Sequence, residues 1–513
     1  MSEKQRLVVI GNGMAGARAV EEILACGGGE QFAITMFGAE PYGNYNRIML
    51  SDVLNGNQSR EQIFLNPLAW YAEHNITLHA GTPVADIDRA AREVVTRQGL
   101  RVPYDILILA TGSHAFVPPM DNLYDSAGHL KQGVFVFRTL DDCQQIASYA
   151  QRSKRAAVIG GGLLGLEAAR GLLSYGCEVH VIQRGSSLMN QQLDSESGAL
   201  LEAAMEALGV HVHCDTLTSG IVGNGHVTGL TFTDGSQLAC DMLVIAAGIK
   251  PNVDLALGCG LSVERGIVVT NLMRSIDDRQ IYAVGECAQH HDMVYGLVAP
   301  IWEQVRVLAD HLTRRNVDAA YHGSKLATKL KVMGVDLASM GRVEAQDEQD
   351  EVVLYSEPKR GIYKKVVIRD DRVIGAILLG DTGRAAYLLQ AFDRNTPLPE
   401  ERAALLFDIG AGARQESLQD LSDDTQICNC NGVSKGAIRQ CIANGNRSPK
   451  AVMAATRAGM GCGSCKSRVQ ELVTLLCAGD VEEDSVIQHS VVDVPLPTPN
   501  RVQTIHERGL KAA

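Results

Sequence analysis

Two glycine-rich loops with the same spacing constrain the fold of this chain more than any other feature. Each loop follows a short apolar run and precedes an amphipathic segment of helical period. Their glycines are Gly11, Gly13 and Gly16 in the first loop and Gly160, Gly162 and Gly165 in the second. In this spacing the first glycine makes a tight turn, the second lets the backbone approach a pyrophosphate, and the third lets the helix pack closely. One match would be weak, but two complete strand–turn–helix–strand units predict two dinucleotide sites.

Other segments fit the same plan. Each unit is followed by an apolar strand that ends in a small-residue turn, at Ala110–Gly112 and at Ala246–Gly248. We expect these turns to return the chain to a bound nucleotide, although two ordinary core strands would look similar. Glu40 stands about where a ribose-binding carboxylate belongs, and Glu286 follows another short apolar run.

The chain changes texture after the second unit. Segments between Tyr321 and Leu398 alternate as strands, with a turn at Asp370–Asp371, and predict an antiparallel sheet domain. A polar stretch then reads as a linker. Beyond it, Ser434 and Ser448 are expected to begin short helices.

Four cysteines near the end of the chain suggest an inorganic centre. They form a C-x-C pair, Cys428 and Cys430, and a C-x-x-C pair, Cys462 and Cys465. Zinc is the main alternative, but a C-x-C pair suits chelation of a single tetrahedral ion less well. Four thiolates are the usual ligand set of a [2Fe–2S] cluster, so the spacing favours iron–sulfur over zinc.

Composition excludes several functions. The net charge of −12 argues against a nucleic-acid or anionic-membrane surface, and no apolar run approaches the ~20 residues of a membrane span. The 513 residues predict three or four domains. The chain has thirteen cysteines, and its N-terminus leaves no room for a signal peptide. Together these features predict a reducing compartment, the cytoplasm. Neither paired carboxylates nor a Ser/His/Asp set suggest hydrolysis.

From about Leu7 to Leu405 the chain resembles the two-dinucleotide flavoprotein reductases, the family that includes ferredoxin, rubredoxin and nitrite reductases. The resemblance implies FAD in the first loop, NAD(P)H in the second, and an interface domain after them. Arg47 matches the basic residue near the FAD pyrophosphate, and Glu286 the acidic residue on the ribityl chain. The implied cofactor-binding residues are Gly11, Gly13, Met14, Ala15, Gly16, Glu40, Arg47, Val84, Ala110, Thr111, Gly112, Gly160, Gly162, Leu163, Leu164, Gly165, Gln183, Arg184, Gly248, Gly285 and Glu286.

The chain departs from this family at two places. Asp52 follows Ser51 where many relatives carry a lysine, so Glu167, which matches the glutamate that pairs with that lysine, faces nicotinamide or water instead and is the catalytic candidate. Gln183 stands where NADH-specific relatives carry glutamate, and Arg184 could bind a 2′-phosphate, which leaves NADH and NADPH both open. A disulfide reductase would need a redox cysteine pair near the flavin, whereas Cys26 stands alone before Cys143. We therefore expect electrons to leave by another route.

The cysteine module resembles the bacterioferritin-associated-ferredoxin type of [2Fe–2S] domain. The whole predicts an α/β fold with two Rossmann-like dinucleotide-binding domains, an α+β interface domain and a small helical [2Fe–2S] domain. The expected boundaries are 1–115 with 246–318 for FAD, 116–245 for NAD(P)H, 319–405 for the interface domain, 406–424 for a linker, 425–478 for the cluster and 479–513 for a tail.

This domain order resembles the electron-transfer subunit of assimilatory nitrate reductase and the N-terminal half of the assimilatory nitrite reductase large subunit. Because the stretch after Cys465 is short, we expect no sirohaem domain. The expected partner is a separate molybdenum-containing nitrate reductase catalytic subunit. Alternatives are an electron donor for a detached nitrite reductase or ferredoxin-like acceptor, a cluster-containing amino-acid or opine oxidase subunit, and a non-enzymatic redox sensor.

Overall fold

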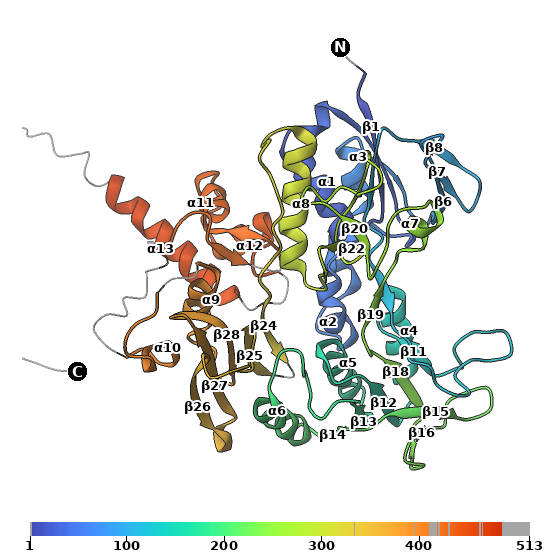
Figure 1. The fold of residues 1–513 in the computed structure, drawn as a ribbon, viewed down its shortest axis with the longest axis vertical. Helices are drawn as coiled ribbons and strands as arrows, with labels where there is room; N and C mark the ends of the chain where they lie inside the picture. Colours follow the sequence, from blue (N-terminus) through green and yellow to red (C-terminus); the bar gives the residue numbers. More distant parts are fainter. Residues whose placement is uncertain are drawn as a thin grey trace, which may run out of the picture.

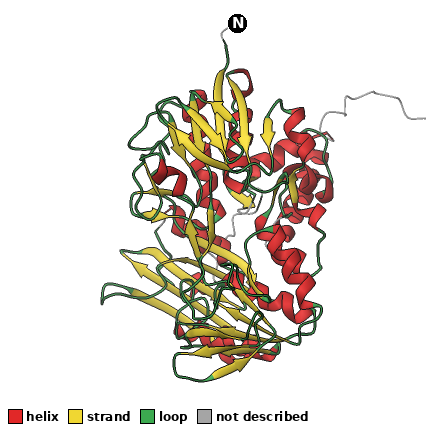
Figure 2. Cartoon of the chain, turned by 90° about the vertical axis from the view of Figure 1, so that its right-hand side faces the viewer, coloured by secondary structure: helices red, strands yellow, loops and turns green. Residues whose placement is uncertain are grey.

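The computed structural model describes residues 3–332, 334–394, 397–409, 418, 421–428, 431–460, 463 and 465–484. Two parallel sheets of five strands each provide its frame, and they lie one above the other (Figure 2). The first has the order β21 (Ile281–Ala283), β9 (Ile106–Leu109), β1 (Gln5–Ile10), β2 (Phe32–Phe37), β5 (Thr77–His79). The second has the order β11 (Val134–Val136), β18 (Met242–Ile245), β12 (Arg155–Ile159), β13 (Glu178–Ile182), β14 (Val210–His213).

Both glycine loops leave the carboxyl end of a central strand. The last four residues of β1 are buried, as is typical of a parallel strand covered on both faces. Helix α1 (Met14–Ala25) follows β1 and packs beside α8 (Val298–Thr313), as Figure 1 shows. Helix α5 (Leu163–Ser174) follows β12, and α4 (Leu140–Ala150) and α6 (Ser195–Ala207) belong to the same half. In open parallel sheets this end of the strands is where ligands bind.

Smaller elements complete the two halves. Each half carries an antiparallel three-stranded meander: β6 (Val84–Asp88), β7 (Glu93–Thr96), β8 (Arg101–Pro103), and β15 (Thr218–Val222), β16 (Gly229–Phe232), β17 (Gln237–Ala239). The strands β10 (Ser113–Ala115) and β19 (Ile249–Pro251) pair where the chain passes between the halves. A short helix α2 (Leu50–Leu54), preceded by the turn at Arg47–Met49, packs its apolar side chains into the core of the second half.

The predicted antiparallel sheet is present. Its order is β24 (Ala327–Val332), β25 (Val335–Gly341), β28 (Arg372–Leu379), β27 (Ile362–Arg369), β26 (Glu351–Glu357). One face packs into the core of the second half, and the other is covered by α9 (Ala385–Arg394) and α10 (Ala403–Leu406). The turn at Asp370–Asp371 lies between β27 and β28, as predicted.

The last module has its own small core. The hairpin β29 (Gln426–Cys428) and β30 (Val433–Ser434) precedes α11 (Lys435–Ala443), α12 (Pro449–Thr456) and α13 (Lys466–Asp484). Ser434 and Ser448 cap α11 and α12 through their side chains, as predicted. The module lies next to α8 and above the antiparallel sheet (Figure 1). In the described part of the chain, no helix is long and apolar enough to cross a membrane.

Candidate functional site

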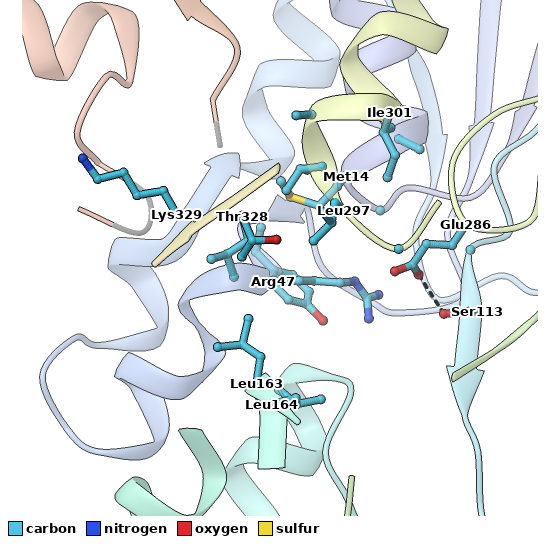
Figure 3. A pocket seen from close by; sticks show the side chains of 18 of the residues that line it. Met14, Arg47, Ser113, Leu163, Leu164, Glu286, Leu297, Ile301, Thr328 and Lys329 are labelled. Atoms are coloured by element: carbon cyan, nitrogen blue, oxygen red, sulfur yellow. Dashed lines mark hydrogen bonds between the residues drawn. The ribbon is translucent and has the colours of Figure 1, made fainter. Parts of the chain in front are cut away.

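A single cavity touches all four parts of the fold. Its volume is about 590 Å³, which lies in the range of small-molecule sites. Side chains from α1, the N-terminus of α5, the segment before α8 and β24 point into it (Figure 3). Residues of the cysteine module complete its wall. The cavity is apolar over most of its lining and carries a few charged groups, as a cofactor site requires.

The first glycine loop leaves room for a phosphate group. Gly11 has φ of +116°, and a Cβ there would lie 2.0 Å from the carbonyl oxygen of Ala110. The turn therefore requires glycine for steric reasons within the protein itself. At Gly13 an added Cβ would meet only Nε of Arg47, at 4.0 Å. Since α1 has no side-chain cap and no acidic residue in its first turn, its positive N-terminus is available to a pyrophosphate.

Arg47 and Glu40 form the polar edge of this cavity. Nη2 of Arg47 pairs with Oε1 of Glu40, and its Nη1 donates to the carbonyl of Arg138 at 3.0 Å. The hydroxyl of Tyr45 donates to Oε2 of Glu40 at 2.8 Å. Burial raises the pKa of Tyr45, so its hydroxyl remains protonated and donates this hydrogen bond. The carboxylate of Glu40 suits the hydroxyl groups of a nucleotide, and the guanidinium of Arg47 suits its phosphate groups.

Glu286 occupies the opposite side of the cavity. Its carboxylate accepts a hydrogen bond from Oγ of Ser113 at 2.7 Å (Figure 3) and pairs with Nη2 of Arg138. Neither Ser113 nor Arg138 was predicted from the sequence. Arg138 connects the Arg47–Glu40 pair with Glu286, since its carbonyl accepts a hydrogen bond from Arg47 and its guanidinium pairs with Glu286.

The second glycine loop repeats the geometry of the first. Gly160 has φ of +118°, and a Cβ there would lie 2.3 Å from the carbonyl oxygen of Ala246. At Gly162 an added Cβ would meet nothing within 4 Å. Helix α5 also begins without a side-chain cap or an acidic residue in its first turn. This loop therefore fits a second pyrophosphate for the same reasons.

Gln183 and Arg184 end up in different environments. Oε1 of Gln183 accepts from the backbone N–H of Gly161 at 2.9 Å, and its Nε2 donates to the carbonyl of Ser187 at 3.1 Å. Its amide is thus held against the second loop. Arg184 is exposed. An exposed cation beside this loop is compatible with an approaching 2′-phosphate.

Glu167 lines the large cavity together with Leu163 and Leu164. These three residues bring the start of α5 to the same space as Gly13 and Arg47, so the two nucleotide units share one cavity. Asp52 does not line it: Oδ1 of Asp52 accepts from Nδ2 of Asn57 at 3.4 Å instead.

The cysteine module contributes directly to the cavity wall. Cys465 is 7% exposed and lines the cavity with Gln426, Ile427 and Arg468, while Cys428 is fully buried next to them. Cys430 and Cys462 lie outside the described residues. Helix α13 begins at Lys466, directly after Cys465, and has no acidic residue in its first turn. Two buried sulfurs at a strand end and a helix N-terminus suit an anionic metal–sulfur centre.

Arg457 attaches this module to the first half of the fold. Its Nη1 lies 3.0 Å from Oε1 of Glu21, and its Nη2 donates to the carbonyl of Leu65 at 2.9 Å and to Oδ1 of Asn66 at 2.8 Å. Ile48, which lines the cavity, also packs against the module's core. The module is therefore docked by both polar and apolar contacts.

Sequence reasoning also missed the start of α8. Gly296 and the residues that follow it line the cavity, and α8 begins without a side-chain cap. The positive end of this helix favours negative charge in the cavity. Lys329 and Arg468 add cationic side chains near the module, and burial lowers the pKa of Arg468.

The structure brings many of the predicted residues together. Those that line the cavity are Gly11, Gly13, Met14, Ala15, Glu40, Arg47, Ala110, Thr111, Gly112, Leu163, Leu164, Glu167, Glu286 and Cys465. Those that do not line it are Gly16, Val84, Gly160, Gly162, Gly165, Gln183, Arg184, Gly248, Gly285 and Cys428. Gly16 and Gly165 pack each helix against its own loop, where a Cβ would lie 1.9 and 1.8 Å from a carbonyl oxygen.

Three protein families match successive parts of the chain. Residues 5–311 match "Pyridine nucleotide-disulphide oxidoreductase", residues 327–396 match "Rubredoxin NAD+ reductase C-terminal domain", and residues 426–474 match "BFD-like [2Fe-2S] binding domain". The predicted fold class and the predicted cofactors FAD, NAD(P)H and a [2Fe–2S] cluster are confirmed by these matches.

Similar proteins include two from Bacillus subtilis (strain 168). A "Nitrite reductase [NAD(P)H]" is 41% identical over 99% of this chain and 62% of its own length. An "Assimilatory nitrate reductase electron transfer subunit" is 40% identical over 92% of this chain and 60% of its own length. The chain thus spans about three-fifths of these two relatives. Among solved structures, a putidaredoxin reductase–putidaredoxin complex aligns with a TM-score of 0.70 and 25% identity, over 79% of this chain and 96% of the other.

Proposed function

We propose that this chain takes electrons from NAD(P)H and delivers them to a separate catalytic protein, because it belongs to the pyridine nucleotide-disulphide oxidoreductase family and carries a BFD-like [2Fe-2S] binding domain. The observation that supports this most is the position of Cys465. It lines the same cavity as Gly13 and Arg47, so a cluster ligand and the first nucleotide loop face one space. Electrons can then leave the nucleotide site without a redox disulfide.

The residues divide into three groups by what they would hold. The first loop, Glu40, Arg47 and Glu286 would bind FAD, and the second loop with Gln183 and Arg184 would bind NAD(P)H. When bound, NAD(P)H supplies a hydride, FAD accepts its two electrons, and a [2Fe–2S] cluster takes electrons one at a time. Leu163 and Leu164 would exclude water from the space between the two nucleotides, since they line its apolar side.

Glu167 is the proposed catalytic side chain. It belongs to α5, the helix that follows the second glycine loop, yet it lines the cavity that the first glycine loop also lines. A carboxylate at that place can orient the nicotinamide amide by accepting a hydrogen bond. Because Asp52 stands outside the cavity, the lysine pairing known in related sequences has no equivalent here.

The cluster ligands are proposed to be Cys428, Cys430, Cys462 and Cys465. The two described sulfurs are buried, one at the end of β29 and one at the start of α13. The domain limits are proposed as 1–115 with 246–318, 116–245, 319–405 and 425–478, joined by a linker at 406–424 and followed by a tail at 479–513.

The catalytic partner is proposed to be the molybdenum-containing subunit of an assimilatory nitrate reductase in the cytoplasm. The relative named as a nitrate reductase electron transfer subunit supports this choice. A second candidate is a nitrite reductase, because another relative of similar identity carries that name.

Purification of the native complex tests the choice of partner. The proposal predicts a copurifying chain that contains molybdenum and NAD(P)H-dependent nitrate turnover by the complex. A copurifying sirohaem protein with nitrite turnover would replace nitrate by nitrite as the acceptor. Flavin that NAD(P)H cannot bleach in the isolated chain would overturn the electron-transfer proposal itself.

A further inference from the structure

A group of histidines lies at the edge of the second parallel sheet, on the neighbouring strands β13 and β14. His180 and His211 are register partners, and their rings stack with centroids 4.7 Å apart and an interplanar angle of 22°. Glu178 precedes His180 by two residues, which places it on the same face of β13. Three side chains that can bind a metal therefore meet on one face of two strands.

The distances within this group match those between ligands of one ion. Nε2 of His180 and Nε2 of His211 lie 3.3 and 3.9 Å from the same oxygen, Oε1 of Glu178. All three ligand atoms lie within 4.8 Å of one another. Tetrahedral bonds of about 2.0–2.1 Å separate two ligands by about 3.4 Å. The side chains of Glu178 and His211 are 51% and 56% exposed, so they can take up the difference, whereas His180 is 10% exposed and held in place.

A third imidazole, that of His213, contacts the buried ligand His180 from its other side. Nδ1 of His180 lies 3.1 Å from Nε2 of His213. A metal-bound imidazole commonly donates its other N–H to a carboxylate, a backbone carbonyl or water, which orients the ring, and Nε2 of His213 would be the acceptor here.

We propose that Glu178, His180 and His211 bind one Zn²⁺ ion, with water as the fourth ligand and His213 orienting His180. Imidazole nitrogens with one carboxylate are ligands that suit this ion. The ion would join β14, the edge strand, to β13. A chain of hydrogen bonds from His213 through His180 to Glu178 would explain two of the contacts without metal. The contact of Nε2 of His211 with the same carboxylate oxygen, at 3.9 Å, is too long for a hydrogen bond and would then be a loose electrostatic contact.

The test uses untagged full-length protein with its flavin and cluster in place. Zn²⁺ binding is measured by competition with a chromophoric chelator, while iron content is followed to exclude exchange at the cysteines. The proposal predicts one Zn²⁺ per chain, bound at least tenfold more weakly by Glu178→Gln and His211→Gln proteins. His213→Gln should weaken binding by roughly 10- to 100-fold through loss of the orienting hydrogen bond. His129→Gln is the matched control, because that imidazole is 80% exposed beside a single carboxylate.

Thermal unfolding provides a second measurement. Zn²⁺ should raise the Tm of the wild-type and His129→Gln proteins and leave that of His211→Gln unchanged, because a ligand that binds only the folded state stabilises it. Both exposed ligands can be replaced without disturbing the core, so unaltered FAD content should accompany the loss of zinc. Equal zinc affinity in wild type and His211→Gln, or no zinc bound by wild type, would overturn the proposal.

Discussion

Replacing Gly13 by alanine should separate the fold of the first loop from its ability to bind FAD. Gly13 has φ of −80° and ψ of −167°, which alanine adopts readily. The added Cβ would meet only Nε of Arg47, at 4.0 Å. A tolerated Gly→Ala change gains about 0.4–1 kcal/mol through the unfolded state. Alanine ranks well below glycine at a helix N-cap, which costs about 0.5–1 kcal/mol. The free energy of unfolding of the flavin-free protein should therefore change by less than about 1 kcal/mol.

The same methyl group would occupy the space that the pyrophosphate needs. Inserting a methyl group into a packed contact costs about 1–3 kcal/mol. At 1.4 kcal/mol per factor of ten, FAD should bind about 5- to 150-fold more weakly. Fluorescence titration of flavin-free protein with FAD measures the FAD affinity, and urea unfolding of the flavin-free protein measures the free energy of unfolding.

Gly162→Ala is the matched control because it holds the same place in the second loop and an added Cβ there meets nothing within 4 Å. It should leave FAD affinity unchanged and raise the KM for NAD(P)H. FAD affinity of the Gly13→Ala protein within twofold of wild type would refute the assignment of this loop to the pyrophosphate. A loss of more than about 2 kcal/mol in the flavin-free protein would show that the methyl group meets protein instead.

Three further predictions concern single side chains. Arg457→Ala should slow electron transfer from flavin to cluster without slowing flavin reduction, as stopped-flow absorbance can show. Because the Arg457 side chain is one third exposed, its loss should weaken docking of the module by only about 1–2 kcal/mol. Arg439→Ala, which removes an ion pair between α11 and Asp423 of the linker, should not change that rate. Arg184→Ala should raise the KM for NADPH more than that for NADH, by about ten- to a hundredfold if a charge-assisted contact with the 2′-phosphate is lost. Equal effects on the two KM values would mean that Arg184 is a surface residue without a role in binding. Cys465→Ser should lose the cluster iron and keep FAD, whereas Cys441→Ser should keep both, as iron and flavin analysis can establish.

Local features of the fold could be read from the sequence because local rules determine them. The glycine spacing predicts both loops, since Gly11 and Gly160 meet a backbone carbonyl that only glycine can approach. Side-chain capping predicts the helix starts at Ser434 and Ser448. The pattern of four cysteines predicts a module that has its own core.

Contacts between distant segments could not be predicted in this way. Arg457 and Glu21 are 436 residues apart, and Arg138 and Glu286 are 148 apart. No periodicity or motif pairs such residues, because the packing of whole domains brings them together. The start of α8 was missed for the same reason, since it lacks the glycine motif that marks the other two helix N-termini.

The histidine group at β13 and β14 illustrates a related limit. His180 and His211 come together through the register of two parallel strands. In the sequence each is an ordinary polar residue of a strand, and only the pairing shows that their Nε2 atoms lie 3.3 and 3.9 Å from one oxygen of Glu178.

Anaerobic stopped-flow mixing with NAD(P)H most directly tests the claim that electrons leave through the cluster beside the flavin cavity. The flavin and cluster absorbance bands are followed in wild-type protein at several protein concentrations. Because Cys465 lines the cavity of the first nucleotide loop, the cluster should be reduced after the flavin at a rate independent of protein concentration. A cluster that stays oxidised while the flavin is reduced, or a rate proportional to protein concentration, would contradict this account.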